Sequence, residues 1–214
     1  MDVVKSFFNL FEGLDYQYIF MVFSPYLCWM LYKRQNRQIT RMVITFTLCL
    51  YTVILIKGCL RIPSAFNSKT YSFPSGHVYA IMAFCGSFFF ETIKSKKVAF
   101  WIMMFSGMFE CLRTVIGGFH TPRDAFSAYI LCTIQFLVIY LYVYKKFDVR
   151  KLLLFCFIGN FVILGLLHFI CHDYMVYKSL EMTKWAILCL VFWLFETYKW
   201  DAKLYNKFKN KKNK

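Results

Sequence analysis

Two short segments of the sequence combine a histidine with groups that bind or polarise an anion. In the first, Pro74-Ser75-Gly76-His77 precedes an apolar stretch. Pro74 disfavours helix in the residue before it, and Ser75 is a favourable N-cap. We therefore expect a helix to begin here, with unpaired N–H groups facing a possible anion and His77 in its first turn. A capped helix start without a catalytic role is the plain alternative.

The second segment runs from Arg113 to Asp124 and ends with a histidine and an aspartate four residues apart. Thr121 and Pro122 are typical of the N-cap and the first residue of a helix, which places Asp124 in its first turn. Asp124 can act there as a capping carboxylate. It can also hold one N–H of the His120 imidazole and leave the other ring nitrogen as a nucleophile or base. The two roles are compatible.

Cationic side chains accompany both segments. Arg113 and His120 are seven residues apart, close to two helical turns, so they lie on nearly the same face. Lys57 and Arg61 are four residues apart, so they are expected to share a face of the helix that precedes residues 61–76. The sequence has no acidic cluster suited to Mg²⁺ and no Cys/His spacing suited to Zn²⁺. These groups favour metal-free cleavage of a phosphate ester, in which cations bind the oxygens, one histidine attacks and the other protonates the leaving alcohol.

The composition places these segments in a membrane protein. The 214 residues are 59% hydrophobic, 21% aromatic and only 17% charged, whereas soluble domains are roughly 45–50% apolar and about 25% charged. The scarcity of charge and glycine excludes disordered chains, collagen and coiled coils. The nine cysteines are dispersed, and we interpret them as small apolar residues of the spans rather than as disulfides or metal ligands.

Six stretches are apolar enough, and close enough to about 20 residues in length, to be membrane-spanning helices. A seventh, 185–198, is borderline in length, and residues 1–14 favour a helix along the interface, with no signal peptide before them. The sequence thus predicts an all-α, polytopic transmembrane helical bundle, a single domain over residues 1–214. It has six spans, or seven if 185–198 also crosses. The six stretches are 17–32, 42–60, 77–93, 98–119, 125–144 and 152–171.

Basic residues gather on alternate connections. Most of the 26 Lys and Arg residues lie in 33–41, 94–97 and 145–151 and in the tail 199–214. The positive-inside rule assigns these segments to the cytoplasmic side, so the motif region 57–124 is predicted to present its site on the outer side. The same rule explains the net charge of +15. A nucleic-acid partner is not expected, because the basic residues lie in short membrane-flanking loops.

The segments resemble the motifs of the type 2 phosphatidic acid phosphatase superfamily, which includes membrane lipid phosphatases, glucose-6-phosphatase and vanadium haloperoxidases. The tetrad 74–77 matches the second motif in full. Arg113, His120 and Asp124 are similar to the third motif, and Lys57, Arg61 and Pro63 to the first.

The spacing departs from the family pattern in both partial motifs. Arg61 is only the fourth residue after Lys57, and Ile62 intervenes before Pro63. Leu112 stands where the third motif usually has Ser, and the interval from Arg113 to His120 is one residue longer than usual. The pair 117–118, both glycines, can absorb that extra residue as a bulge or helix end. Such changes are similar to those of a divergent bacterial-type subgroup that acts on envelope lipids.

The resemblance implies a phosphoenzyme mechanism without a metal or other cofactor. His120 would be the nucleophile that forms a phosphohistidine, Asp124 would orient it, and His77 would be the general acid. The implied substrates are phosphate monoesters or pyrophosphates of envelope lipids, in a bacterial inner (cytoplasmic) membrane with the active site facing the periplasm. The phosphoryl oxygens would be held by Lys57, Arg61, Ser75, Gly76 (through its backbone N–H) and Arg113.

Two other functions stay open at this point. One is a lipid phosphotransferase, in which a lipid alcohol instead of water resolves the phosphohistidine. The other is a non-catalytic membrane protein whose outward cations bind anionic head groups, and in that case His120→Ala would preserve function. Phosphatidic acid, phosphatidylglycerol phosphate, undecaprenyl pyrophosphate and lipid A are all compatible with the sequence.

Overall fold

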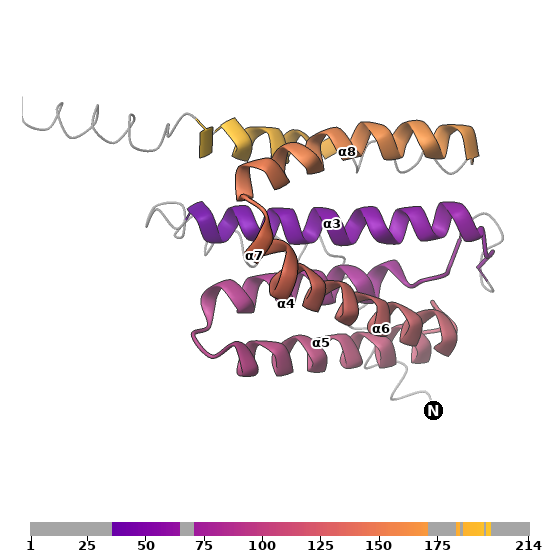
Figure 1. The fold of residues 1–214 in the computed structure, drawn as a ribbon. Helices are drawn as coiled ribbons and strands as arrows, with labels where there is room; N and C mark the ends of the chain where they lie inside the picture. Colours follow the sequence, from indigo (N-terminus) through magenta and orange to yellow (C-terminus); the bar gives the residue numbers. More distant parts are fainter. Residues whose placement is uncertain (1–35, 65–70, 171–182, 185, 195, 198–214) are drawn as a thin grey trace, which may run out of the picture.

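The computed structural model describes residues 36–64, 71–170, 183–184, 186–194 and 196–197. Helices account for most of them, and apart from an isolated bridge between Pro63 and Tyr71 these residues form no β-structure. The predicted all-α bundle is confirmed (Figure 1). The helices are α3 (Asn36–Leu60), α4 (Gly76–Thr92), α5 (Lys96–Ile116), α6 (Pro122–Val138), the π-helix η1 (Ile139–Val143), α7 (Tyr144–Lys146) and α8 (Val149–Ile170).

Five of the predicted spans coincide with these helices to within a few residues. Helices α3, α5 and α8 and the continuous helix from α6 through α7 are long and apolar enough to cross a membrane, which supports an integral membrane protein. Helix α4, at 17 residues, is the shortest of the five. The predicted span 17–32, residues 1–14 and the tail 199–214 lie outside the described residues. The borderline stretch 185–198 is described only in part, as helix at 186–194 and 196–197.

Consecutive helices run in opposite directions, so their connections alternate between the two ends of the bundle (Figure 1). Residues 61–64, 71–75 and 117–121 lie at one end, and 93–95 and 147–148 lie at the other. The motif segments therefore share the end that is remote from the basic connections, as the charge pattern predicts. Their assignment to the outer side of a membrane stays a prediction.

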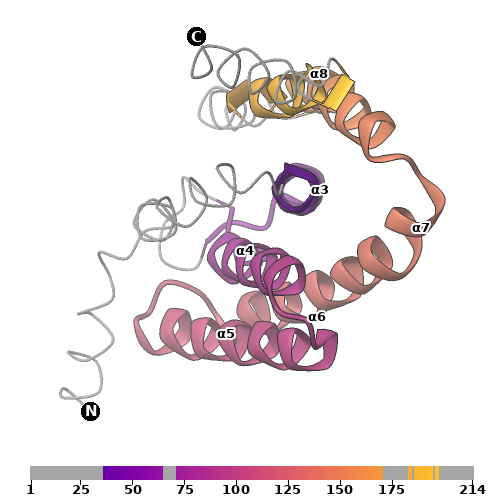
Figure 2. The same ribbon diagram turned by 90° about the vertical axis from the view of Figure 1, so that its left-hand side faces the viewer.

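Helix α4 is the central element of the bundle. It packs against α3, α5 and α6, and in the end-on view of Figure 2 it lies between α3 and α5 with α6 beside it. Close packing is possible because Gly86 has no side chain: a β-carbon there would lie 2.6 Å from the sulfur of Met103 and 2.7 Å from the Phe136 ring. Small residues bring membrane helices together in this way. Helix α4 is thus held on three sides.

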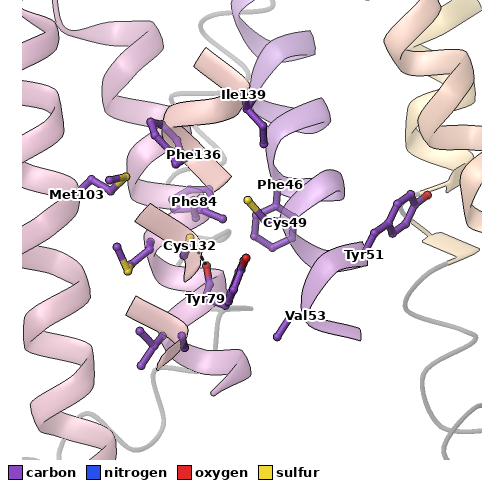
Figure 3. Close-up of a cluster of buried hydrophobic side chains, with 14 of the residues drawn as sticks. Phe46, Cys49, Tyr51, Val53, Tyr79, Phe84, Met103, Cys132, Phe136 and Ile139 are labelled. Atoms are coloured by element: carbon purple, nitrogen blue, oxygen red, sulfur yellow. Dashed lines mark hydrogen bonds between the residues drawn. The ribbon is translucent and has the colours of Figure 1, made fainter. Parts of the chain in front are cut away.

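The bundle interior combines apolar packing with a small polar network. Figure 3 shows the apolar cluster between α3, α4, α5 and α6, including Met103 and Phe136. Within it, Tyr79 Oη donates to Gln135 Oε1 (2.5 Å) and Gln135 Nε2 donates to Thr52 Oγ1 (2.8 Å). Polar groups within a membrane need internal partners, and these bonds join α3, α4 and α6. The seven cysteines within the described ranges are free and five of them are buried, as expected for small apolar residues.

Candidate active site

The two histidine segments meet at one end of the bundle through their backbones. Ser75 is the N-cap of α4, its hydroxyl accepting from the N–H of Val78, and Thr121 caps α6 in the same way, accepting from the N–H of Asp124. Both predicted helix starts are confirmed. The backbone N–H of Ser75 also donates to the carbonyl oxygen of Asp124 (3.1 Å), so the N-terminal ends of α4 and α6 are fixed side by side.

The imidazoles of His77 and His120 lie next to each other. His77 Nδ1 and His120 Nε2 are 3.5 Å apart. The ring centroids are 5.7 Å apart, and the ring planes are inclined to each other by 61°. His77 comes from the first turn of α4 and His120 from the loop before α6. Two residues 43 apart in the sequence are therefore brought side by side.

The His120 imidazole is kept neutral by its surroundings. The residue is only 9% exposed. Burial, followed by the nearby His77 and Lys57, lowers the pKa of His120 to about 4, and the Asp124 carboxylate opposes this shift. At neutral pH the ring therefore carries no charge, and one of its nitrogens has a lone pair available for attack on an electrophile.

Asp124 is close to His120 but is not hydrogen-bonded to it. The residue is 2% exposed and occupies the first turn of α6. His120 Nδ1 is buried and has no hydrogen-bond partner among the described residues. The expected His120–Asp124 hydrogen bond is thus not formed in this structure. The physical reason is that His120 precedes the N-cap Thr121, so the loop, not the helical four-residue spacing, directs its side chain.

Lys57 reaches the N-terminus of α4 from the last turn of α3. Its Nζ donates to the carbonyl oxygen of Tyr71 (3.0 Å). The same atom would lie 3.7 Å from a β-carbon placed on Gly76. Because Gly76 has no side chain, the ammonium group and the first N–H groups of α4 border the same space. A cation beside a helix N-terminus is a favourable place for a phosphate oxygen.

Arg61 follows Leu60, the last residue of α3, in a conformation that usually belongs to glycine, so, contrary to expectation, it does not share a helical face with Lys57. Its φ is 49°, and its N–H donates to the carbonyl oxygen of Lys57 (3.0 Å), which closes the helix with a left-handed cap. A left-handed conformation costs a residue with a β-carbon roughly 1–2 kcal/mol. The Arg61 side chain is exposed, so no packing contact in the interior explains why an arginine occupies this position.

Arg113 is buried near the end of α5 and is held by an acidic neighbour. Its Nε donates to Glu110 Oε2 (2.8 Å) and its Nη2 to Glu110 Oε1 (2.7 Å). The guanidinium also lies 5.8 Å from the centre of the Phe119 ring. The sequence analysis did not single out Glu110. The available signal was an acidic residue inside an apolar span, three positions before an arginine.

The two glycines after α5 turn the chain back toward the site. Gly118 has a φ of 77°, and its N–H donates to the carbonyl oxygen of Val115 (3.1 Å). The N–H groups of Phe119 and His120 both donate to the carbonyl oxygen of Thr114 (2.9 and 3.2 Å). This is the Schellman pattern of a helix end. The expectation of a helix end at the glycine pair is confirmed.

The arrangement is suited to a phosphoryl group. It offers a neutral imidazole, a second imidazole beside it, a helix N-terminus and the charges of Lys57 and Arg113, both of which act on His120. Within the described ranges, no group of three or more His, Cys, Asp and Glu side chains is placed to hold a metal ion. The imidazoles and the cationic groups are of the kinds that bind an anion and attack its central atom.

The comparison with protein families agrees with this chemistry. Residues 55–148 match the family model of the PAP2 superfamily. The match begins in the last turns of α3, ends after α7 and includes each of the predicted site residues. Neither the curated proteins nor the proteins of known structure include a match to the chain.

Proposed function

We propose that the chain is a membrane phosphatase that hydrolyses phosphorylated lipids, because residues 55–148 match the family model of the PAP2 superfamily, which includes phosphatases. The observation that carries this proposal is the 3.5 Å approach of His77 to His120 at the N-terminus of α4. The substrates are phosphate monoesters or pyrophosphates of envelope lipids. The reaction takes place on the outer leaflet, which for a bacterial inner membrane is the periplasmic side.

In the first step, a ring nitrogen of His120 attacks the phosphorus atom. The N–P bond forms as the bond from phosphorus to the lipid oxygen breaks, and His77 donates a proton to the leaving oxygen. The low pKa of His120, about 4, supports this assignment, because the attacking ring must be neutral. Asp124 stabilises the positive charge that the His120 ring acquires as the N–P bond forms.

In the second step, water resolves the phosphohistidine. His77, now neutral, accepts a proton from the water as its oxygen bonds to phosphorus and the N–P bond breaks. Inorganic phosphate leaves and His77 is again protonated. The phosphoryl oxygens are held throughout by Lys57, Arg61, Ser75, the backbone N–H of Gly76, and Arg113.

A small apolar hollow lies between α3 and α4, beside the site. It begins at Gly76, the residue that Lys57 approaches. Its volume is about 20 Å³, far below the roughly 300–1,000 Å³ of pockets that enclose a drug-sized ligand, so its apolar lining is consistent with a lipid but the hollow does not hold one. It is lined by Phe46, Cys49, Leu50 and Val53 of α3 and by Gly76, Tyr79, Ala80 and Ala83 of α4.

The proposal is tested by measuring phosphate release from single purified lipids in detergent micelles. The panel is phosphatidic acid, phosphatidylglycerol phosphate, undecaprenyl pyrophosphate and lipid A, with the His120→Ala protein as the blank. We expect release from at least one lipid, no release by the variant, and no effect of EDTA. A requirement for an added metal ion would contradict the mechanism.

The same assay separates the other two functions. A phosphotransferase would release phosphate poorly from a single lipid and would transfer it when a lipid alcohol is added. A non-catalytic head-group binder would release none, and its lipid binding would survive His120→Ala. Label from a phosphate-labelled lipid should remain on the wild-type chain and be missing from the variant if His120 forms the intermediate.

A further inference from the structure

The end of α5 contains a buried ion pair between Arg113, which the proposed reaction uses, and Glu110, to which it gives no role. Glu110 is 6% exposed and Arg113 is 8% exposed. The carboxylate accepts two hydrogen bonds from one edge of the guanidinium, at 2.8 and 2.7 Å. A bidentate pair of this kind fixes the orientation of the arginine as well as its position.

Stability alone does not explain this pair. Removing two charges from water costs about as much as their attraction returns, so a buried ion pair is often no more stabilising than two apolar side chains of the same volume. A lone buried arginine is strongly unfavourable, however. If Arg113 is needed at this place, a buried partner is needed with it, and Glu110 is that partner.

Arg113 lies beside the loop that carries the reacting histidine. Its guanidinium is 5.8 Å from the centre of the ring of Phe119, the residue before His120. The following residue, Thr114, accepts the backbone hydrogen bonds of both Phe119 and His120. The turn of α5 that carries the ion pair is therefore the turn that holds the His120 loop.

We propose that Glu110 is a positioning residue for Arg113: its carboxylate holds the guanidinium beside His120 before the phosphoryl group arrives. This role for Glu110 rests on the proposed function, in which Arg113 binds the phosphoryl group of the substrate. A pre-oriented arginine loses less freedom when the anion binds, so binding is tighter than with a mobile side chain. Glu110 itself does not touch the substrate.

The test compares two buried glutamates that each pair with an arginine. Glu110→Gln keeps the shape and removes the charge near the site. Glu91→Gln does the same at the opposite end of α4, where the Glu91 side chain is 7% exposed and lies 3.8 Å from Arg41. The readout is the inhibition constant of inorganic phosphate, with kcat and KM. We expect Glu110→Gln to weaken phosphate inhibition about tenfold and to raise KM more than it lowers kcat. Glu91→Gln should leave the inhibition constant, KM and kcat unchanged.

A double-mutant cycle shows whether Glu110 acts through Arg113. In the Arg113→Met background, the further change Glu110→Gln should have no additional effect on the phosphate inhibition constant. Equal effects in both backgrounds, or tighter phosphate binding by Glu110→Gln, would overturn the proposal, since the second result would mean that the carboxylate competes with phosphate. If Glu110→Gln does not fold, Glu110→Asp keeps the charge but shortens the side chain, and it too should weaken inhibition.

Failure of this inference is distinguishable from failure of the proposed function. If the wild-type protein releases no phosphate from any lipid of the panel, the proposed function is wrong. If the wild type is active and Glu110→Gln behaves like Glu91→Gln, only the role of Glu110 is wrong.

Discussion

The backbone N–H of Ser75 donates a hydrogen bond to the backbone carbonyl oxygen of Asp124 across 3.1 Å. This bond joins the first turns of α4 and α6, which carry the residues on either side of the reacting centre. Because both partners are backbone atoms, the frame that holds His77 beside His120 does not depend on the imidazoles themselves. The histidines can be replaced without removing this connection.

We therefore expect His77→Ala and His120→Ala to abolish phosphate release while the helical bundle remains folded. His120→Ala removes the nucleophile, and His77→Ala removes the proton donor to the leaving oxygen. Phosphate release from the best lipid of the panel is the measurement, and the circular dichroism of the purified variants checks the fold. His168→Ala is the matched control. His168 is exposed on α8, so its replacement should leave phosphate release unchanged. Full activity in His120→Ala would rule out the phosphohistidine.

Asp124→Asn should lower kcat by at least about a hundredfold. The structure contains no His120–Asp124 hydrogen bond, so the expected loss comes mainly from charge. The Asp124 carboxylate favours a positive His120 ring, and the ring becomes positive as the N–P bond forms. Asp148→Asn, at an exposed aspartate near the other end of the bundle, is the control and should retain kcat. An increase in KM with an unchanged kcat would show that Asp124 serves substrate binding instead.

The pH dependence of kcat/KM should reflect the low pKa of His120. Burial and the nearby charges bring this pKa to about 4, compared with roughly 6.5 for an ordinary histidine. Protonation removes the nucleophile, so the acid limb due to His120 is expected near pH 4, with activity lost as the pH falls through it. Lys57 contributes to the lowering, and Lys57→Met should therefore move this limb to higher pH. The ionisation of the substrate phosphate supplies a second limb that the variant leaves in place. A single limb near 6.5 that does not respond to Lys57→Met would contradict the assignment.

Local signals in the sequence predicted the frame of the site. The caps at Ser75 and Thr121 depend on the residue itself and its immediate neighbours, and both are present in the structure. The helix end at Gly118 depends on one positive φ, which glycine adopts at little cost. The apolar stretches likewise predicted five described helices, because each must satisfy its own backbone within a membrane.

Tertiary contacts account for what the sequence analysis missed. The pairing of Glu110 with Arg113 depends on both side chains being excluded from solvent by the packing around α5. The π-helix η1 lies within the predicted span 125–144, directly before Tyr144, whose hydroxyl bonds to Arg41 and Thr45 of α3. A contact between residues about a hundred positions apart leaves no periodic signal in either segment.

Replacing Arg61 should separate stability from activity. Arg61→Gly relieves the left-handed strain at φ 49° and is expected to raise the free energy of unfolding by up to about 1 kcal/mol. Arg61→Ala keeps a β-carbon and should bring no such gain. If the exposed guanidinium binds a phosphoryl oxygen, both variants should raise KM by a similar factor. Thermal unfolding in detergent and lipid phosphatase kinetics are the two measurements. Unchanged KM in both variants would remove Arg61 from the binding site.

Gly118→Ala should damage the site through the backbone alone. A β-carbon at Gly118 would meet no atom within 4 Å, so any effect comes from its φ of 77°. The strain of roughly 1–2 kcal/mol can be relieved only if the Schellman turn opens, and the turn fixes the N–H of His120. Gly165→Ala is the matched control, because it too has open space but no left-handed φ. We expect the Gly118 variant to lose thermal stability and kcat together and the Gly165 variant to lose neither. Equal behaviour of the two variants would mean that the helix end does not position His120.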